Sequence, residues 1–248
     1  MTLITSVQNN LVKKMKKLHM AKERKKQSQF LLEGTHLVET AVASGWPIEM
    51  LLVSDDYALT GDLASLPYEV ISDNVLEHLS VTKTPQGIIA LANMKEMDFP
   101  RESTRVLVCD GVQDPGNLGT IIRTADAAGF DAVIYGKGSA DLYNDKTVRS
   151  TQGSLFHIPV IQADLLEKLP ELKSAGFHVW GAALQESVIY NEAEKTEKLA
   201  IIVGNEGAGI REEILEMADT IVKIPIYGQA ESLNVAIAAG ILMYEAKK

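Results

Sequence analysis

The feature that most constrains the fold is a series of short, almost wholly apolar runs in the second half of the chain, which alternate with stretches of helical character. Four of them lie at residues 106–109, 132–135, 178–183 and 199–203. Strands that are apolar throughout are buried on both faces of a sheet. Strands that alternate with helices are typical of a parallel sheet covered by helices. The sequence therefore predicts an α/β fold with a parallel sheet for residues 105–248.

The first part of the chain predicts a smaller, separate α/β domain. Residues 5–45 are interpreted as two helices, the second ending at Gly45, a usual helix-terminating residue. Short strands are expected at 48–53, 68–71 and 87–92, with a helix before residue 79. A charged stretch with little apolar periodicity follows and has the character of a linker. We expect domains at 1–95 and 105–248 with a linker at 96–104.

Composition excludes several classes of protein. Hydrophobic residues make up 46% of the 248 and charged residues 23%, as in ordinary globular proteins. No apolar run has the length of a membrane span, and the N-terminus lacks the apolar core of a signal peptide. Cys109 is the one cysteine, so an internal disulfide and a cysteine metal cluster are excluded, and the five histidines lack metal-ligand spacing. We expect a cytoplasmic protein with no membrane partner and no metal.

The net charge of −9 argues against a surface coated with nucleic-acid-binding charge, but basic residues are concentrated near the N-terminus. Residues 13–26 contain eight lysines and arginines against Glu23 alone. Such a surplus is a candidate phosphate-binding face. A solvated helix surface remains an equal alternative.

Three loops follow strands at the edge of the sheet where α/β proteins bind ligands, at residues 110–119, 204–209 and 226–234. Arg123, in an apolar helix after the first loop, suits a phosphate or carboxylate, or an ordinary salt bridge. The second loop has glycines spaced G-x-x-G-x-G, which is neither the dinucleotide fingerprint nor a Walker loop and also fits a tight turn. In the third, Ser232 and Asn234 can cap an apolar helix that we expect to be packed on both sides.

Taken together, the three loops resemble the signature motifs of the SpoU/TrmH family of SPOUT-class RNA ribose 2′-O-methyltransferases. The matching segments are NLGTIIRTADAAGF, IVGNEGAGI and IPIYGQAESLNVAIAAGIL. The segments SVQNNLVKKMKKL, FLLEGTHLVE and TPQGIIA are similar to the accessory substrate-binding domain of that family, which has an L30e-like α/β/α fold. The resemblance covers nearly the whole chain.

The resemblance implies a deep C-terminal trefoil knot, a homodimer, and S-adenosylmethionine (SAM) bound in the knot largely by backbone groups. The implied cofactor-binding residues are Ala183, Leu184, Gly204, Gly207, Ile224, Ile226, Leu233 and Ala236. The implied catalytic residues are Arg123, Asn117, Ser232, Asn234 and Glu206. An arginine is a poor base, so we expect Arg123 to position the ribose 2′-OH and stabilise the developing alkoxide.

With this family in view, the basic N-terminal segment is interpreted as an RNA contact. The candidate RNA-binding residues are Lys13, Lys16, Lys17, Arg24, Lys25 and Arg149. Relatives with this accessory domain mostly modify large-subunit ribosomal RNA, which is therefore the favoured substrate. Two alternatives stay open, namely a tRNA ribose methyltransferase and a non-catalytic RNA-binding or ribosome-assembly protein.

Overall fold

The computed structural model describes residues 3–185 and 187–247, which fall into two compact units. Unit 1 consists of Met1–Glu96 and Tyr143–Phe156, and unit 2 of Met97–Leu142 and His157–Lys248. The expected boundary, a linker at 96–104, stays a prediction. Within the described ranges, no helix is long and apolar enough to cross a membrane.

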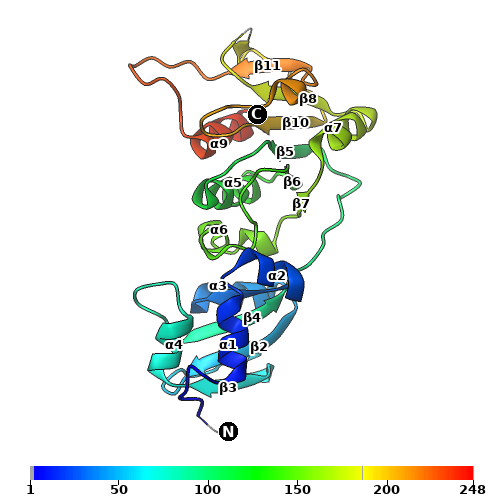
Figure 1. Cartoon of the computed structure of the whole chain (residues 1–248). Helices are drawn as coiled ribbons and strands as arrows, with labels where there is room; N and C mark the ends of the chain where they lie inside the picture. Colours follow the sequence, from blue (N-terminus) through cyan, green and yellow to red (C-terminus); the bar gives the residue numbers. More distant parts are fainter. Residues whose placement is uncertain (1–2, 186, 248) are drawn as a thin grey trace. The chain divides into compact units, whose positions relative to one another are not determined.

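Unit 1 is built on a four-stranded mixed sheet in the order β1-β4-β2-β3 (Figure 1). β4 is antiparallel to both β1 and β2, and β3 runs parallel to β2. The strands are β1 (Gln29–Glu33), β2 (Ile48–Ser54), β3 (Tyr68–Ile71) and β4 (Ile88–Asn93). The helices are α1 (Asn10–Lys17), α2 (Ala21–Gln27), α3 (Thr35–Ala43), α4 (Asp73–Leu79) and α6 (Asp145–Thr151), with 3₁₀ turns at Gly61–Ser65 and Ser154–Phe156.

The core of unit 1 lies between α1, α4 and the sheet. Val12 and Met15 of α1 pack with Val75 and Leu79 of α4. All four side chains are fully buried. α1 can pack in this way because it places its apolar residues on one face and its lysines on the other.

Unit 2 is a seven-stranded parallel sheet in the order β7-β6-β5-β10-β8-β11-β9, which confirms the predicted fold class. Its strands are β5 (Arg105–Cys109), β6 (Ala132–Tyr135), β7 (Val160–Gln162), β8 (His178–Ala182), β9 (Val188–Ile189), β10 (Leu199–Val203) and β11 (Thr220–Lys223). The helices are α5 (Pro115–Ala127), α7 (Leu165–Ser174), α8 (Glu212–Leu215) and α9 (Val235–Glu245). The trefoil knot stays a prediction.

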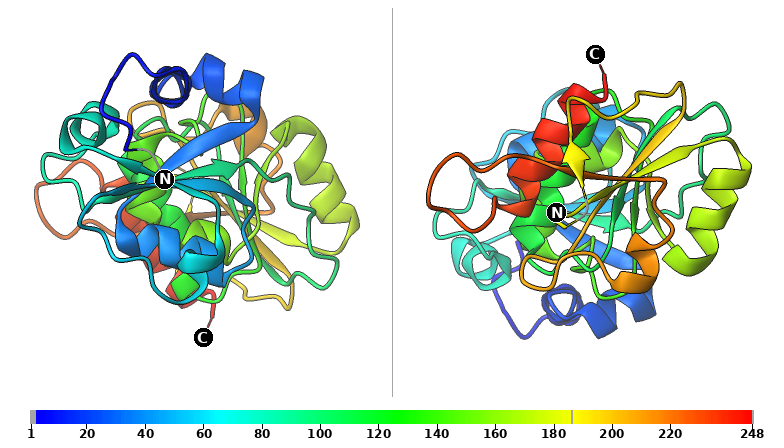
Figure 2. Two further views of the ribbon diagram at one scale, coloured as in Figure 1. Left: turned by 90° about the horizontal axis from the view of Figure 1, so that it is seen from below. Right: turned by 90° about the horizontal axis from the view of Figure 1, so that it is seen from above.

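The helices of unit 2 cover both faces of its sheet. α5 and α9 pack together on one face, and α7 and α8 on the other (Figure 2). Leu165 and Leu169 of α7 and Ile214 of α8 contact Val106 and Ile202 of the sheet, and all five are buried. The apolar strands therefore have the covered faces that their composition predicts.

The structure corrects two expectations and adds one strand that was not predicted. Residues 5–45 hold three helices and a strand, because α2 ends at Ser28 in the left-handed conformation and the chain then enters β1. The strand β9 was not predicted, because two residues are too few to give a pattern in the sequence. Full burial of α9 is wrong for the single chain, since Ile237 and Tyr244 are 56% and 55% exposed.

Candidate active site

The three loops at the carboxyl edge of the unit 2 sheet converge on Asn117. The Asn117 amide donates a hydrogen bond to Glu206 Oε1 at 3.0 Å, and the Asn234 amide donates to Asn117 Oδ1 at 3.0 Å. One side chain from each loop thus forms a continuous polar chain. The predicted convergence of Asn117, Glu206 and Asn234 is present in the structure.

Asn117 and Asn234 are each held in place at the start of a helix. Asn117 lies in the first turn of α5, where the Asp114 side chain caps the helix by accepting the Asn117 N–H at 2.9 Å. Asn234 caps α9, since its Oδ1 accepts the N–H groups of Ala236 and Ile237 at 2.9 and 3.3 Å. Because Asn234 Oδ1 is engaged by the helix, its amide nitrogen is left to face Asn117.

Glu206 is tied to the first loop through both carboxylate oxygens. They accept the backbone N–H groups of Gln113 at 3.1 Å and Asp114 at 3.0 Å, besides the Asn117 amide. Partial burial raises the pKa of Glu206, but these hydrogen bonds together outweigh it and lower the pKa below the ordinary value. The carboxylate is therefore charged at neutral pH and acts as an acceptor only.

The glycine-rich loop is a closed turn. Asn205 and Gly209 exchange two backbone hydrogen bonds of 2.9 and 3.0 Å, and Asn205 Oδ1 accepts the N–H groups of Gly207 and Ala208. A Cβ added to Gly204 would overlap the backbone of Gly209 and Ile210. Only glycine can occupy that position without moving the turn.

An ion pair between the buried Asp110 and the partly exposed Arg211 joins this turn to the start of the first loop. Asp110 is 1% exposed and accepts the Arg211 backbone N–H and Nε, both at 2.9 Å, with Arg211 Nη2 also at 2.9 Å. A carboxylate so deeply buried requires such partners. The pair holds the ends of β5 and of the glycine turn together, which keeps Glu206 in reach of Asn117.

Arg123 lies on the exposed face of α5, two turns beyond Asn117. It makes no hydrogen bond or ion pair with any residue in the part of the chain that the structure describes. The ordinary salt bridge considered from the sequence is therefore not formed. A guanidinium without a protein partner keeps all its donors for another molecule.

An open cleft of about 540 Å³ lies beside these loops, between the ends of β8 and β11 and the start of α9. Five of the predicted cofactor-binding residues line it, together with the predicted catalytic Ser232: Ala183, Leu184, Ile224, Ile226 and Leu233. Gly204, Gly207 and Ala236 do not line it. Ser232 is exposed.

Sequence reasoning missed several residues of this region. Ala182, Val222, Lys223, Ala238 and Leu242 also line the cleft. They are strand and helix residues of apolar type, apart from Lys223, and nothing distinguishes them in sequence from the core. Asp110 and Arg211 were also missed, although an aspartate directly after a buried strand is a usable signal.

The predicted RNA-binding residues all lie in unit 1, but they differ in how exposed their side chains are. Lys13, Lys17 and Lys25 are exposed, whereas Lys16 is half-buried and donates to the His78 carbonyl. Arg149 is half-exposed and pairs with Asp145 at 3.3 Å.

Arg24 differs from the other candidates, because it is 3% exposed. Its Nη1 donates to the carbonyls of Leu18 and His19 at 2.8 Å each, where α1 ends. Arg24 therefore closes the α1–α2 junction and offers no surface to a ligand.

Comparison with known proteins agrees with this architecture. Residues 104–244 match the model of the SpoU rRNA Methylase family, and residues 9–90 match that of the MRM3-like substrate binding domain. The 23S rRNA (guanosine(2553)-2′-O)-methyltransferase RlmP of Bacillus subtilis is 49% identical over 98% of this chain and 98% of its own.

Two solved structures are similar over the whole chain. The AdoMet-bound rRNA methyltransferase from Sinorhizobium meliloti superposes with a TM-score of 0.92 at 32% identity, covering 99% of this chain and 97% of its own. An RNA 2′-O ribose methyltransferase superposes with a TM-score of 0.85 at 36% identity, covering 99% and 98%. The family model spans more than half of the chain and carries the converging loops, so this protein belongs to the SpoU rRNA methylase family and is an RNA 2′-O-methyltransferase.

Proposed function

We propose that this protein transfers a methyl group from SAM to a ribose 2′-OH of 23S ribosomal RNA. The observation that carries the proposal is the row of side-chain hydrogen bonds from Glu206 through Asn117 to Asn234, which joins the three loops beside the apolar cleft. It brings a polar, rigid site next to a space shaped for a small ligand. The relatives described above act on ribosomal RNA or RNA ribose by name.

The cleft fits the cofactor in its chemistry. The lining is aliphatic apart from Lys223 and Ser232, which suits an adenine ring. When bound, SAM supplies a methyl group on a sulfonium. Leu184 and Leu233 are exposed at the cleft and would close over it.

The residues around Asn117 would position the reacting ribose. Arg123 is available to contact the 2′-oxygen or an adjacent phosphate, because no described residue pairs with it. It would stabilise the negative charge that develops on the oxygen as the proton leaves. Asn117, Ser232 and Asn234 would orient the sugar, and Glu206 would keep the Asn117 amide in one orientation.

Ribosomal RNA is favoured over tRNA because unit 1 contains the segment that matches a substrate-binding domain. The exposed Lys13, Lys17 and Lys25 would provide its phosphate contacts, with the half-buried Lys16 and the paired Arg149 as further candidates. Arg24 is left out of this surface because it is buried and bonded to carbonyls.

The protein would act in the cytoplasm as a homodimer. The exposed face of α9, which carries Ile237 and Tyr244, is apolar and adjoins the cleft through Ala238 and Leu242. A helix that is apolar on all sides is normally covered. A second copy of the chain would cover this face and bring two sites together.

Methyl transfer from tritiated SAM to purified, unmodified 23S rRNA and tRNA tests the proposal. We expect incorporation into 23S rRNA at a single ribose. Incorporation into tRNA alone would support the tRNA alternative. RNA binding without SAM binding in calorimetry would support the non-catalytic one.

A further inference from the structure

Unit 1 contains a groove of its own, separate in its lining from the cleft of unit 2. It has a volume of about 560 Å³ and opens between the start of α3, the loop before β4 and the end of α6. We call it the unit 1 groove and define it by the residues His36, Thr84, Gln86, Arg149 and Gln152, with Glu33, Gly34, Leu37 and Thr82 at its base.

The groove presents one fixed hydrogen-bond donor and one fixed acceptor. Gln86 Oε1 accepts the Thr35 backbone N–H at 3.0 Å, which leaves its amide nitrogen as a donor for a ligand of the groove that Gln86 lines. Gln152 does the reverse, since its amide nitrogen donates to the Arg149 carbonyl at 3.0 Å and leaves its oxygen exposed. Backbone groups have a single polarity, so both amide orientations are determined by chemistry.

An exposed aromatic ring lies at the rim. His36 Nε2 is 3.3 Å from the Gln152 carbonyl oxygen, and this contact restrains the ring at the mouth of the groove. Gly34 has φ of 99° and lets Gln86 approach the start of α3 closely. A planar ring beside paired amides is the combination with which proteins bind unstacked nucleobases.

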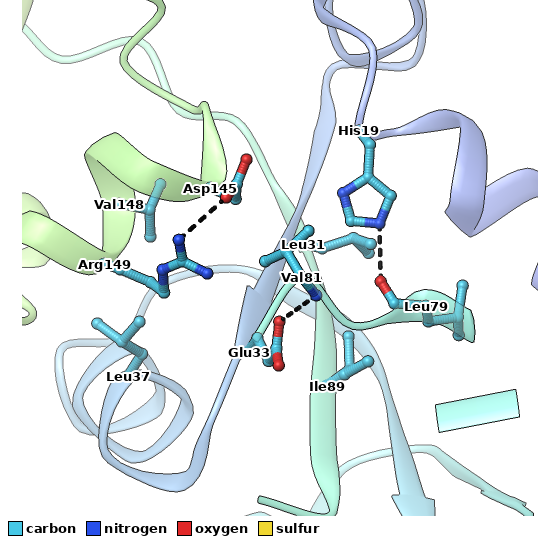
Figure 3. Close-up of a pocket in the computed structure, with 10 residues that line it drawn as sticks. All are labelled: His19, Leu31, Glu33, Leu37, Leu79, Val81, Ile89, Asp145, Val148 and Arg149. Carbon is cyan, nitrogen blue, oxygen red and sulfur yellow. Dashed lines mark hydrogen bonds and ion pairs between the residues drawn. The ribbon is translucent and has the colours of Figure 1, made fainter. Parts of the chain in front are cut away.

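The base of the groove selects against a phosphate. Glu33 accepts the Val81 backbone N–H at 2.9 Å (Figure 3). It also accepts the Thr82 hydroxyl, so its carboxylate is fixed there. The charge of Arg149, which also lines the groove, is paired with Asp145. A bound anion would be repelled by Glu33, whereas the edge of a neutral base would not.

The basic helix α1 adjoins this region. His19 Nε2 contacts the Leu79 carbonyl oxygen at 2.7 Å (Figure 3). Lys16 donates to the carbonyl of the neighbouring His78, so both contacts lie at the end of α4. A smaller pocket lined by His19 and Leu79 shares Glu33, Leu37 and Arg149 with the groove. An RNA backbone that follows the lysines would therefore pass the mouth of the groove.

From these contacts we infer that the unit 1 groove binds one unpaired base of the RNA substrate and thereby selects the RNA that is methylated. Gln86 and Gln152 would hydrogen-bond to the base edge, and His36 would stack on its face. The inference rests on the proposed function, because it assumes that RNA is the substrate.

The test compares Gln86→Glu with wild type in methylation of unmodified 23S rRNA. The substitution keeps the oxygen that accepts the Thr35 N–H and replaces the amide donor by an acceptor, so α3 keeps its cap. We expect KM for the RNA to rise about tenfold, as for loss of one base contact, with the SAM dissociation constant unchanged in calorimetry. Gln8→Glu is the matched control, because it makes the same charge change on an exposed residue of unit 1 outside the groove.

His36 provides an independent variant. His36→Ala should raise KM by about tenfold, which is typical of losing one base–aromatic stack, and His36→Phe should restore most of the loss. The inference is overturned if Gln86→Glu and Gln8→Glu have the same KM, or if His36→Phe is as impaired as His36→Ala. Failure of wild type to methylate 23S rRNA would instead refute the proposed function.

Discussion

Arg123 is the residue whose surroundings most directly predict a catalytic effect. It is exposed on α5 and has no partner among the described residues, so its removal should leave the fold intact. Arg123→Ala should lower kcat by roughly 10²–10³-fold, the effect of losing one donor to a developing oxyanion. The SAM dissociation constant should not change.

Single-turnover methylation together with calorimetry would measure both quantities. Arg101→Ala is a suitable control, because Arg101 is also an exposed arginine of unit 2. An equal loss of turnover and cofactor binding would mean that Arg123 has a structural role.

Glu206 gives a prediction for pH dependence. Its pKa is lowered in the folded protein, so its contribution to stability is complete above the ordinary value of 4.5 and is lost as the pH falls through the folded value. Glu206→Gln places an amide donor against the N–H groups of Gln113 and Asp114. The variant should therefore unfold at a lower temperature than wild type at neutral pH, and this difference should close as the pH falls below about 4.5.

Thermal unfolding followed by circular dichroism across that range would test the prediction. Glu231→Gln, an exposed glutamate of the third loop, serves as the control and should show no such convergence. A wild-type advantage that persists at low pH would contradict the hydrogen-bonding role of the Glu206 carboxylate.

At the scale of elements, the glycine turn after β10 offers a matched pair of substitutions. Gly204→Ala places a Cβ against the backbone of Gly209 and Ile210, which cannot give way without opening the turn. We expect a loss of about 3 kcal/mol or more in the free energy of unfolding. Gly207→Ala meets only Asn205 Oδ1 at 3.6 Å and should cost under about 1 kcal/mol.

Urea denaturation of the two variants would measure this difference. Similar stabilities for both would mean that the turn moves easily. In that case the closed geometry around Asn205 would not be what positions Glu206.

The elements of unit 2 could largely be predicted from the sequence, because its strands are wholly apolar and its helices begin at clear caps. Asp114, Asp164 and Asn234 each cap a helix through their side chains. The polar chain at the site was predicted in outline for the same reason, since Asn117 and Asn234 both lie at helix starts.

What the sequence could not provide were features that depend on partners far along the chain. β1 was missed because its pairing partner, β4, lies about sixty residues later. The burial of Arg24 depends on the tight α1–α2 junction, and lysines around it gave the same local pattern as an exposed surface. The cleft-lining residues look like core in sequence, since apolar type does not distinguish a filled space from an open one.

For the whole molecule, the exposed face of α9 predicts self-association. Ile237→Glu should shift the protein from dimer to monomer, because it places a charge in the middle of an apolar face that is 56% exposed at this residue. Light scattering after size-exclusion chromatography would measure the mass. Leu166→Glu on α7, where Leu166 is 41% exposed, is the control and should leave the mass unchanged. A wild-type monomer at micromolar concentration would contradict the dimer.

The chain crosses between the two units three times, because residues 143–156 belong to unit 1 while both of their flanks belong to unit 2. Thr147, Val148 and Thr151 of this insert are buried. In a shortened protein that begins at residue 97, these side chains would lose their neighbours in residues 1–96 and become exposed to water. Unit 1 is thus assembled from two separate stretches of chain, and deleting the first would leave residues 143–156 without the rest of their unit.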